Sequence, residues 1–235
     1  MTRQLLLTTL ETILPRSPSV KSFFLRLPPG QHFVFKAGQF ISIHLQKEEK
    51  TIRKPYSIAS PPYESDLLEL CIKRVEGGFV SSAFFSFQEG ITLPIDGPDG
   101  VFILKEPLSP RMIFIGTGTG IAPLRSMILS LFHQHYGGEI TLVFGVRDEN
   151  EILYGESFLR LSEVQPNFRF IPIVSRPTGW MGERGHVQDR LERWTGNPED
   201  NSAYICGLPD MVGAVREKLK SLGFDRKQIR YEKYV

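Results

Sequence analysis

The 235-residue sequence predicts two structural parts, an antiparallel β-barrel or sandwich followed by an α/β part with a parallel sheet. Three observations lead to this prediction. Residues 1–105 contain short apolar runs separated by turn formers, which is typical of antiparallel strands. From residue 111 onward, strand-like runs alternate with helical patterns, which favours a parallel sheet covered on both faces. Prolines 107 and 110 lie between the two patterns, and we place the boundary between residues 106 and 107.

Six strands are expected in the first part, at residues 4–13, 20–27, 39–45, 55–59, 67–74 and 91–95. Several of these runs alternate or are rich in Val, Ile and Phe, and turn formers such as Pro28-Pro29-Gly30 bound them. A helix is expected at residues 79–87, opening after Gly77-Gly78. Six strands at this spacing are typical of a closed barrel or of a sandwich, and both remain open at this point.

Five strands are expected in the second part, at residues 112–115, 140–144, 168–174, 203–206 and 228–232. The clearest helix is predicted at residues 123–135, because Pro123 suits a first helical position and Leu124, Ile128 and Leu131 follow at helical spacing. A second helix is predicted at residues 209–222, with a proline in its first turn and Gly223 after its end.

The composition excludes several classes of protein. A hydrophobic share of 41% with seventeen Phe can offset the entropy of ordering, so the chain is not disordered. A net charge of +2 is too small for a dedicated nucleic-acid or membrane-surface binder. The two cysteines, Cys71 and Cys206, cannot ligate an iron–sulfur cluster or a four-cysteine zinc site, so redox chemistry would need an organic cofactor or a haem.

The same sequence carries no targeting signal that we recognise. No apolar run approaches the roughly 18 residues of a membrane helix, and the first ten residues contain no cleavage site of a signal peptide. We therefore expect a cytoplasmic protein with reduced thiols, and neither a membrane nor a nucleic acid as a partner.

A glycine-rich segment, Gly116-Thr117-Gly118-Thr119-Gly120-Ile121-Ala122-Pro123, joins the first strand of the second part to the first helix. Glycines let a backbone approach a ligand closely, and a helix N-terminus offers unpaired N–H groups with partial positive charge. A pyrophosphate suits this arrangement, although the spacing is neither the G-x-G-x-x-G of ordinary dinucleotide folds nor a P-loop. The alternative is a tight structural turn.

The second predicted strand of this part ends with a basic residue. Arg147 comes first, and Asp148 and Glu149 lie behind it. An ordinary NAD fold has an acid after this strand for the ribose hydroxyls. The order found here favours a ligand with a 2′-phosphate, and the alternative is a solvated arginine at a strand end.

The third predicted strand ends with a second set of phosphate-binding candidates. Ser175 and Arg176 supply one hydroxyl donor and one planar guanidinium, a pair well suited to a phosphate. Arg184 and His186 follow in a glycine-rich loop and could extend the pair. Taken singly, each of these two is as well explained as a surface residue of the loop.

In the first part, Lys54-Pro55-Tyr56-Ser57 supplies a cation, an aromatic ring and a hydroxyl within four residues. On a strand, Lys54 and Tyr56 share one face and Ser57 takes the other. A flat heteroaromatic cofactor needs a ring to stack on and a cation for its phosphate. The alternative is an ordinary strand with a half-buried tyrosine.

Ser81 lies near the start of the helix predicted at residues 79–87. In that position its hydroxyl could donate to a second phosphate. The alternative, equally open, is that Ser81 or Ser82 caps the helix.

Together these segments resemble the ferredoxin–NADP reductase superfamily, in the family's order and over nearly the whole chain. The segments are Lys54-Pro55-Tyr56-Ser57, Leu70-Cys71-Ile72-Lys73-Arg74, Gly78-Phe79-Val80-Ser81, Gly97-Pro98-Asp99-Gly100-Val101-Phe102, Gly116 to Pro123, Phe144-Gly145-Val146-Arg147 and Cys206-Gly207-Leu208. The resemblance implies a six-stranded antiparallel FAD-binding barrel at residues 1–106 and a five-stranded parallel, Rossmann-like NADP-binding domain at residues 107–235. It also implies that the flavin lies in the cleft between them.

On the flavin side, the resemblance implies that Tyr56 stacks on one face of the isoalloxazine and that Ser57 hydrogen-bonds near N5. Lys54 stands where the family usually has Arg, facing the FAD pyrophosphate, and a lysine keeps the charge but loses the bidentate geometry. The ribityl chain and the pyrophosphate would be lined by Cys71, Ile72, Lys73, Gly78, Phe79, Val80 and Ser81.

On the nicotinamide side, the resemblance implies that the glycine loop takes the NADP pyrophosphate and the nicotinamide end. The loop residues concerned are Thr117, Gly118, Thr119, Gly120 and Pro123, and Arg147, Gly207 and Leu208 would complete the cofactor site. Ser175 and Arg176 match the family's 2′-phosphate pair, with Arg184 in place of its Lys and His186 in place of its Tyr.

The resemblance also implies roles at the reacting end. Cys206 would lie beside the nicotinamide C4, and the alternative is a small buried strand residue. Glu232 and Tyr234 resemble the family's terminal Glu-x-Tyr. Tyr234 would cover the second flavin face until nicotinamide displaces it, although Val235 follows it here.

The function implied is transfer of hydride between NADPH and FAD, and of single electrons between FAD and a separate ferredoxin, flavodoxin or oxygenase component. Ser57 would steady N5 and Glu232 would link it to solvent as a proton route. The protein is expected to be a monomer. The alternatives are an NAD(P)H:free-flavin reductase, which the lysine at position 54 would permit, an NADH-dependent oxygenase reductase, or a non-turnover subunit of a larger electron-transfer complex.

Overall fold

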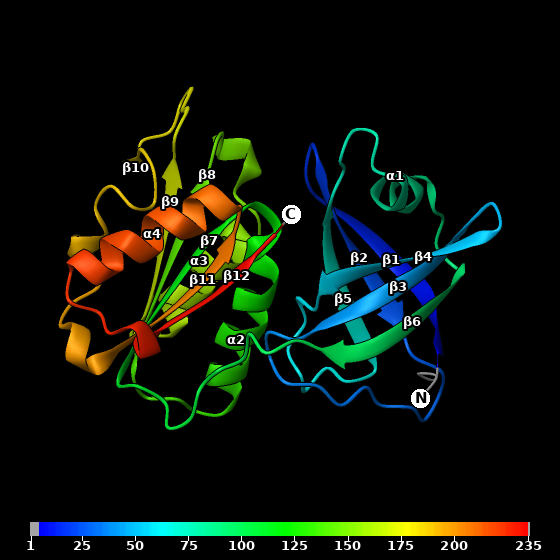
Figure 1. Cartoon of the computed structure of the whole chain (residues 1–235), viewed down its shortest axis with the longest axis horizontal. Coiled ribbons are helices and arrows are strands. Elements are labelled where there is room, and N and C mark those ends of the chain that lie inside the picture. The colour runs from blue at the N-terminus through cyan, green and yellow to red at the C-terminus, as the bar shows by residue number, and fades with distance from the viewer. Residues whose placement is uncertain (1–4, 235) are drawn as a thin grey trace.

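The computed structural model describes residues 5–234 of the chain. The first part contains one antiparallel sheet of six strands in the order β4-β3-β6-β1-β2-β5. Its strands are β1 (Leu6–Ser17), β2 (Val20–Arg26), β3 (Phe40–Lys47), β4 (Lys50–Ser57), β5 (Leu67–Lys73) and β6 (Thr92–Asp99), and helix α1 (Phe79–Ser86) lies between the last two. Figure 1 shows this part beside the second one.

The six-stranded sheet curls into a barrel-like form that no continuous ladder closes. Its edge strands are β4 and β5, and a single bridge between Ile58 and Leu70 joins them just after β4 ends. Fully buried side chains such as Phe23, Ile41 and Ile95 fill its interior. One sheet encloses this core, so the sandwich alternative is wrong, and the barrel alternative is right in form but is not closed by a continuous ladder.

Several strands of the barrel are longer than the sequence predicts, among them β1, β4 and β6, the last of which extends to Asp99. Strand β4 begins at Lys50 and pairs along its full length with β3, from Phe40 with Ser57 to Lys47 with Lys50. Its first half is polar and mostly exposed, so no apolar alternation marks it as a strand. Strand β1 extends to Ser17, and its predicted start at Gln4 lies outside the described residues.

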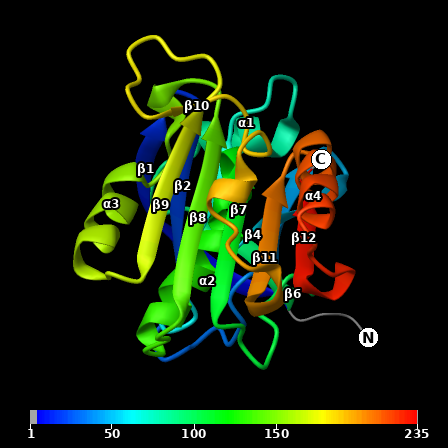
Figure 2. The ribbon, with the colours of Figure 1, turned by 90° about the vertical axis from the view of Figure 1, so that its left-hand side faces the viewer.

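The second part contains a parallel sheet in the order β10-β9-β8-β7-β11-β12. The strands are β7 (Arg111–Thr117), β8 (Glu139–Val146), β9 (Phe168–Val174), β10 (Glu183–Arg184), β11 (Asn201–Gly207) and β12 (Ile229–Lys233), and the helices are α2 (Ile121–His133), α3 (Gly155–Val164) and α4 (Pro209–Ser221). The five predicted strands are confirmed, and the two-residue β10 adds a sixth at the edge. Figure 2 looks onto this sheet.

The helix after the glycine loop begins earlier than predicted. Helix α2 starts at Ile121, so Pro123 is its third residue and not its first. A proline is tolerated there because the first four N–H groups of a helix have no intrahelical partner. The helix ends at His133, and His135 just beyond it adopts a left-handed conformation with φ 56°. Helix α3 was not predicted; only Phe158 of its residues is fully buried.

Two apolar clusters cover the two faces of the parallel sheet. Helices α2 and α3 pack on one face, and α4 packs on the other. The first cluster continues into the barrel through Ala59, Cys71 and Phe102, and Figure 1 shows α2 lying between the two sheets. The division at residues 106 and 107 stays a prediction. Within residues 5–234, no helix has both the length and the apolar character to cross a bilayer.

Candidate functional site

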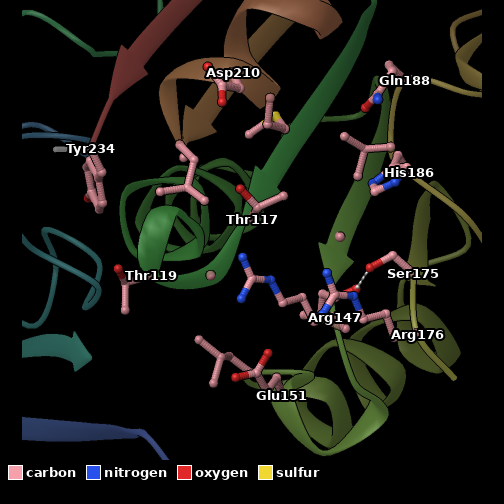
Figure 3. Close-up of a pocket in the computed structure, with 18 of the residues that line it drawn as sticks. Thr117, Thr119, Arg147, Glu151, Ser175, Arg176, His186, Gln188, Asp210 and Tyr234 are labelled. Carbon is pink, nitrogen blue, oxygen red and sulfur yellow. Dashed lines mark hydrogen bonds between the residues drawn. The ribbon is translucent and has the colours of Figure 1, made fainter. Parts of the chain in front are cut away.

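A cavity of about 690 Å³ lies at the carboxyl edge of the parallel sheet, facing the barrel. Open parallel sheets bind ligands at this edge. The loops that follow β7, β8, β9 and β11 line most of it, together with Val20 and Lys73 of the barrel and Tyr234 near the C-terminus. Figure 3 shows Thr117 in the middle of the site, with Tyr234 and Asp210 on one side and Arg147, Arg176 and His186 on the other.

The glycine loop forms a cradle at one wall of the cavity. Gly118 has a φ of +55°, and a Cβ there would project into open space. A Cβ at Gly120 would collide with the backbone of Cys206, so only glycine allows the loop to pass this close to β11. The Thr117 hydroxyl is buried and has no hydrogen-bond partner within residues 5–234. An unpaired hydroxyl beside a helix N-terminus fits a phosphate group.

The opposite wall carries the cationic residues that the sequence predicts. Backbone bonds hold the ends of β8 and β9 together, from Ser175 N to Val146 O at 3.0 Å and from Arg176 N to Arg147 O at 2.8 Å. This pairing places Arg147, Ser175 and Arg176 on one wall, and Figure 3 shows His186 on the same side. The wall therefore presents two guanidinium groups and one hydroxyl, a set that suits a dianionic phosphate.

The two acids behind Arg147 do not line the cavity. Asp148 accepts the backbone N–H of Asn150 at 2.9 Å. The Glu149 carboxylate accepts from the Thr178 hydroxyl at 2.7 Å and from the backbone N–H of Gly179 at 2.6 Å. Hydrogen bonds, that from the Thr178 side chain first, lower the pKa of Glu149 to about 2. The acid that an ordinary NAD fold offers to the ribose is thus committed to the loop after β9.

At the other end of the cavity, four predicted residues from both parts of the chain meet. The Tyr234 hydroxyl donates to Ser57 Oγ at 2.6 Å, and Ser57 Oγ donates to Glu232 Oε1 at 3.4 Å. Cys206 lies beside them, since its thiol and the Tyr234 phenol each shift the pKa of the other. Ser57 ends strand β4 of the barrel, whereas Cys206 and Glu232 are paired neighbours on β11 and β12. We refer to Ser57, Cys206, Glu232 and Tyr234 as the junction cluster.

Burial governs the protonation of the junction cluster. It raises the pKa of Glu232, and the hydrogen bond from Ser57 opposes that rise. Burial also raises the pKa of Cys206 and of Tyr234 well above their ordinary values. The thiol and the phenol therefore keep their protons at neutral pH, and Glu232 is the member whose charge changes most readily.

The flavin-side candidates lie on β4, next to α1. Tyr56 is half-buried with its ring edge-on to Phe84 at 5.7 Å between centroids, and burial raises its pKa to about 12. Lys54 is exposed. Arg53 points away from it and binds Asp96 through two bonds of 2.9 and 2.7 Å. Lys54 is therefore the cation that this strand offers to a diphosphate.

Helix α1 begins without a side-chain cap. Its N-cap residue is Gly78, so the interpretation of Ser81 or Ser82 as the cap is wrong. Ser81 Oγ instead accepts from Val75 N and donates to Gly78 O, both at 3.2 Å. The first N–H groups of α1 remain open to an anion, which fits a second phosphate at this end.

Most of the remaining candidates lie near the glycine loop or near α1 and do not line the cavity. Phe79 and Val80 belong to α1, Cys71 and Ile72 are buried in β5, and Gly120 and Pro123 are buried at the start of α2. Gly207 and Leu208, in contrast, line the cavity. The Arg184 guanidinium donates to Trp180 O at 2.6 Å and lies outside the lining. The predicted roles of these residues stay predictions.

Sequence reasoning did not single out three polar residues of the lining, Glu151, Gln188 and Asp210. Glu151 pairs with Lys73 of the barrel at 3.9 Å. Asp210 lies in the first turn of α4, directly after Gly207-Leu208-Pro209, so its place beside that motif was the available signal. Gln188 lies two residues after His186, at the end of the glycine-rich loop, so that loop was the available signal, whereas Glu151 lies in a short turn with no pattern.

The arrangement defines a two-domain oxidoreductase that binds a flavin on the barrel and a nicotinamide nucleotide on the parallel sheet. Comparison with known proteins agrees. The family model described as the oxidoreductase FAD-binding domain matches residues 7–103, and that described as the oxidoreductase NAD-binding domain matches residues 114–217. The chain is 34% identical to ferredoxin–NADP reductase B of Sorangium cellulosum, over 96% of each protein.

Two further comparisons extend this result. The chain is 33% identical to reductase component 2 of terephthalate 1,2-dioxygenase from Comamonas sp, over 88% of this chain but only 61% of that longer relative. The crystal structure of the Amycolatopsis cytochrome P450 reductase GcoB superposes with a TM-score of 0.88 at 27% identity, covering 99% of this chain and 71% of that one. The chain belongs to the ferredoxin–NADP reductase superfamily and is an FAD- and NAD(P)-binding oxidoreductase.

Proposed function

We propose that the protein passes hydride between NADPH and FAD, and single electrons between FAD and a ferredoxin, a flavodoxin or an oxygenase component. The observation that carries this proposal is the junction cluster, where Ser57 of the barrel meets Cys206, Glu232 and Tyr234 of the parallel sheet at the end of the nucleotide cavity. Bound FAD supplies the chemistry that links two-electron and one-electron transfer. The chain supplies binding, orientation and a proton route.

The contacts of the junction cluster support a role for each residue. Ser57 Oγ lies between a phenol that donates to it and a carboxylate that accepts from it, so it can orient a ring nitrogen and relay a proton. Glu232 connects that hydroxyl to solvent, since its pKa is raised but its side chain is only half-buried. Cys206 and Tyr234 exclude water from the space between them.

The cationic wall favours NADPH over NADH. Arg147, Ser175 and Arg176 face the cavity, and Glu149 is tied to Thr178 and Gly179. A ribose hydroxyl would find no carboxylate from that position, whereas a 2′-phosphate would find two guanidinium groups. The adenosine end of the site therefore selects the phosphorylated coenzyme.

The one-electron partner lies outside these 235 residues. Both cysteines are buried, so the chain has no ligand set for an iron–sulfur cluster of its own. The relatives include a ferredoxin–NADP reductase and a dioxygenase reductase component, which supports a small carrier or an oxygenase component as the partner. A cytoplasmic monomer is part of the same proposal.

Anaerobic titration of the FAD-loaded chain with NADPH and with NADH tests the proposal. We expect NADPH to bleach the flavin absorbance with one equivalent, and a far higher concentration of NADH to be needed. Addition of oxidised ferredoxin or flavodoxin should then restore the absorbance. Loss of bleaching with both coenzymes would reject the oxidoreductase assignment, and equal use of both would reject the 2′-phosphate assignment alone.

One observation favours a second function, reduction of free flavin. Arg53 is bound to Asp96, so Lys54 is the cation of β4 left for a flavin diphosphate, and a lysine lacks the bidentate grip of arginine. Gel filtration of the FAD-loaded chain separates the two functions. Retention of one FAD per chain supports the bound cofactor, and complete loss of FAD with turnover of added flavin supports the alternative.

A further inference from the structure

Five polar side chains from both parts of the chain meet in a buried group next to the cavity. Glu69 of β5, Arg16 of β1 and Ser22 of β2 come from the barrel, while Arg125 of α2 and Tyr154 at the start of α3 come from the other part. Only 2% of the Glu69 surface is exposed. We refer to these five residues as the interdomain cluster.

Glu69 is the centre of the interdomain cluster. Its Oε1 accepts from Ser22 Oγ at 2.5 Å and from the Tyr154 hydroxyl at 2.9 Å, and it pairs with Arg16 Nη2 at 3.0 Å. Its Oε2 pairs with Arg125 Nη1, also at 3.0 Å. Each oxygen therefore binds a group from the parallel-sheet part, and the carboxylate cannot keep both bonds if the two parts shift.

The Tyr154 ring is held between two cations from different parts of the chain. The guanidinium carbons of Arg16 and Arg125 lie 4.7 and 4.8 Å from its centroid, within the range of cation–π attraction. Tyr154 also has a left-handed backbone with φ 57°, which is strained for a residue with a side chain. The contacts of its ring and hydroxyl hold it in that conformation.

The interdomain cluster extends to the segment that follows Ser57. Arg125 Nη1 donates to Ala59 O and the adjacent Ser126 Oγ donates to Ser60 O, both at 2.7 Å. Ser60 Oγ in turn accepts the backbone N–H of Glu69 at 3.0 Å. Helix α2, which starts at the glycine loop, is thereby fixed against the strand end that carries Ser57.

We propose that the interdomain cluster sets the position of the parallel-sheet part against the barrel, and that Glu69 is a positioning residue for hydride transfer. This inference rests on the proposed function, because hydride passes between groups held by different parts. Apolar contacts between the parts are not directional, whereas the charge-assisted bonds of a buried carboxylate depend on distance and angle. Near-attack geometry requires reacting atoms about 3–3.5 Å apart, and a displacement of about 1 Å can cost on the order of 10²-fold in rate.

The variant Glu69→Gln tests the inference, with Asp96→Asn as the matched control. Asp96 is also buried, at 4% exposed, and also binds an arginine and a histidine, but Arg53 and His44 both belong to the barrel. Three quantities are measured on each FAD-loaded chain. They are the stopped-flow rate of flavin reduction at saturating NADPH, the affinity for 2′,5′-ADP, and the number of calorimetric unfolding transitions.

For Glu69→Gln we expect flavin reduction at least about tenfold slower, with 2′,5′-ADP affinity and FAD content within about twofold of wild type. The single transition of the wild type should split into two, because the parts no longer unfold as one unit. Asp96→Asn should unfold at a lower temperature in one transition and reduce flavin at the wild-type rate.

A wild-type rate in Glu69→Gln, or an equal slowing in Asp96→Asn, would overturn the inference. If Glu69→Gln does not fold, Tyr154→Phe replaces it, since it removes one donor and keeps the ring between the arginines; an unchanged rate and a single transition in that variant would also overturn it. If the wild type itself is not reduced by NADPH, the proposed function fails. The calorimetric comparison still decides whether the interdomain cluster couples the two parts.

Discussion

At the scale of single residues, Ser57 is the barrel residue that hydrogen-bonds with Tyr234 and Glu232 of the second part. Its Oγ accepts from Tyr234 and donates to Glu232, and its side chain is buried at the end of β4. A serine is small enough for both bonds, and alanine would remove both. A single substitution to alanine therefore tests the role of the hydroxyl without altering the fold.

Replacement of Ser57 by Ala should slow flavin reduction by NADPH on the order of 10–100-fold, because the relay between the cofactor and Glu232 is lost. The Michaelis constant for NADPH should change little, since the cationic wall is untouched. Stopped-flow absorbance of the FAD-loaded variant measures the rate. An unchanged rate at full FAD occupancy would reject the role of Ser57, and Ser57→Thr, which keeps the hydroxyl, provides the control.

The raised pKa of Glu232 predicts the direction in which the stability of the protein changes with pH. Burial raises its pKa in the folded state, so the folded protein binds a proton that the unfolded chain has already released. The stability that Glu232 contributes is complete below the ordinary pKa of about 4.3 and is lost as the pH rises through the raised value. Glu232→Gln has no proton to lose, so it should gain stability relative to wild type between pH 4 and pH 8.

Denaturant unfolding of both proteins at the two pH values measures that difference. A free-energy difference that is the same at pH 4 and pH 8 would show that Glu232 is solvated in the folded state. If Glu232→Gln instead loses stability relative to wild type as the pH rises, the surroundings of Glu232 stabilise its carboxylate and do not destabilise it.

Much of the junction cluster could be predicted at this scale, and the interdomain cluster could not. Ser57, Cys206, Glu232 and Tyr234 each stand in or near a motif, and the structure brings them together, while their roles stay predictions. Glu69 and Tyr154 stand in segments that read as an ordinary strand and a loop. Buried partners separated by 85 residues leave no local pattern, so only the fold reveals them.

At the scale of elements, the loop after β9 binds the acid that follows β8, which under the proposed function favours NADPH. Thr178 and Gly179 of this loop donate to the Glu149 carboxylate, while Arg176 N bonds to Arg147 O. The acid behind β8 thus shapes the loop that follows β9. The carboxylate of Glu149 accepts hydrogen bonds from the loop and does not line the coenzyme cavity.

Glu149→Gln should weaken binding of 2′,5′-ADP by about tenfold, because the ionised acceptor of the loop is lost and charge-assisted bonds are the stronger ones. Binding of 5′-AMP, which lacks the 2′-phosphate, should change less than about twofold. Isothermal titration of both nucleotides measures the effect. Glu156→Gln removes an exposed carboxylate of α3 and is the control; equal weakening of both nucleotides would refute the assignment.

Elements were predictable where an apolar pattern marks them. The strands β7, β8 and β11 are largely buried, β9 is buried at its first residue and its last two, and all four were predicted. The first half of β4 is polar on both faces because it extends from the sheet as a hairpin arm with β3. Strand β10 has only two residues. Neither can be recognised from hydrophobic periodicity, which reports burial and not hydrogen bonding.

At the scale of the whole molecule, two of the sets of polar contacts that join the parts differ in the number of bonds they make. The interdomain cluster is charged, and both oxygens of its buried Glu69 carboxylate are bonded. The other set is the bond from the Tyr234 hydroxyl to Ser57, made by the second-last residue of the chain. The cluster can hold the parts together while the tyrosine moves.

Under the proposed function, the nicotinamide ring takes the place of Tyr234 beside Ser57, so the tyrosine should oppose coenzyme binding. Tyr234→Ala is expected to bind NADP⁺ about fivefold more tightly, since a net hydrogen bond of about 1 kcal/mol no longer has to be broken. The affinity for 2′,5′-ADP, which has no nicotinamide, should stay the same. Difference absorbance titration of the FAD-loaded chain measures both affinities.

The control variant is Tyr234→Phe. It keeps the ring and loses the hydroxyl, so it separates the effect of the hydrogen bond from that of the size of the side chain. Tighter binding of both nucleotides, or of neither, would mean that Tyr234 does not occupy the nicotinamide position.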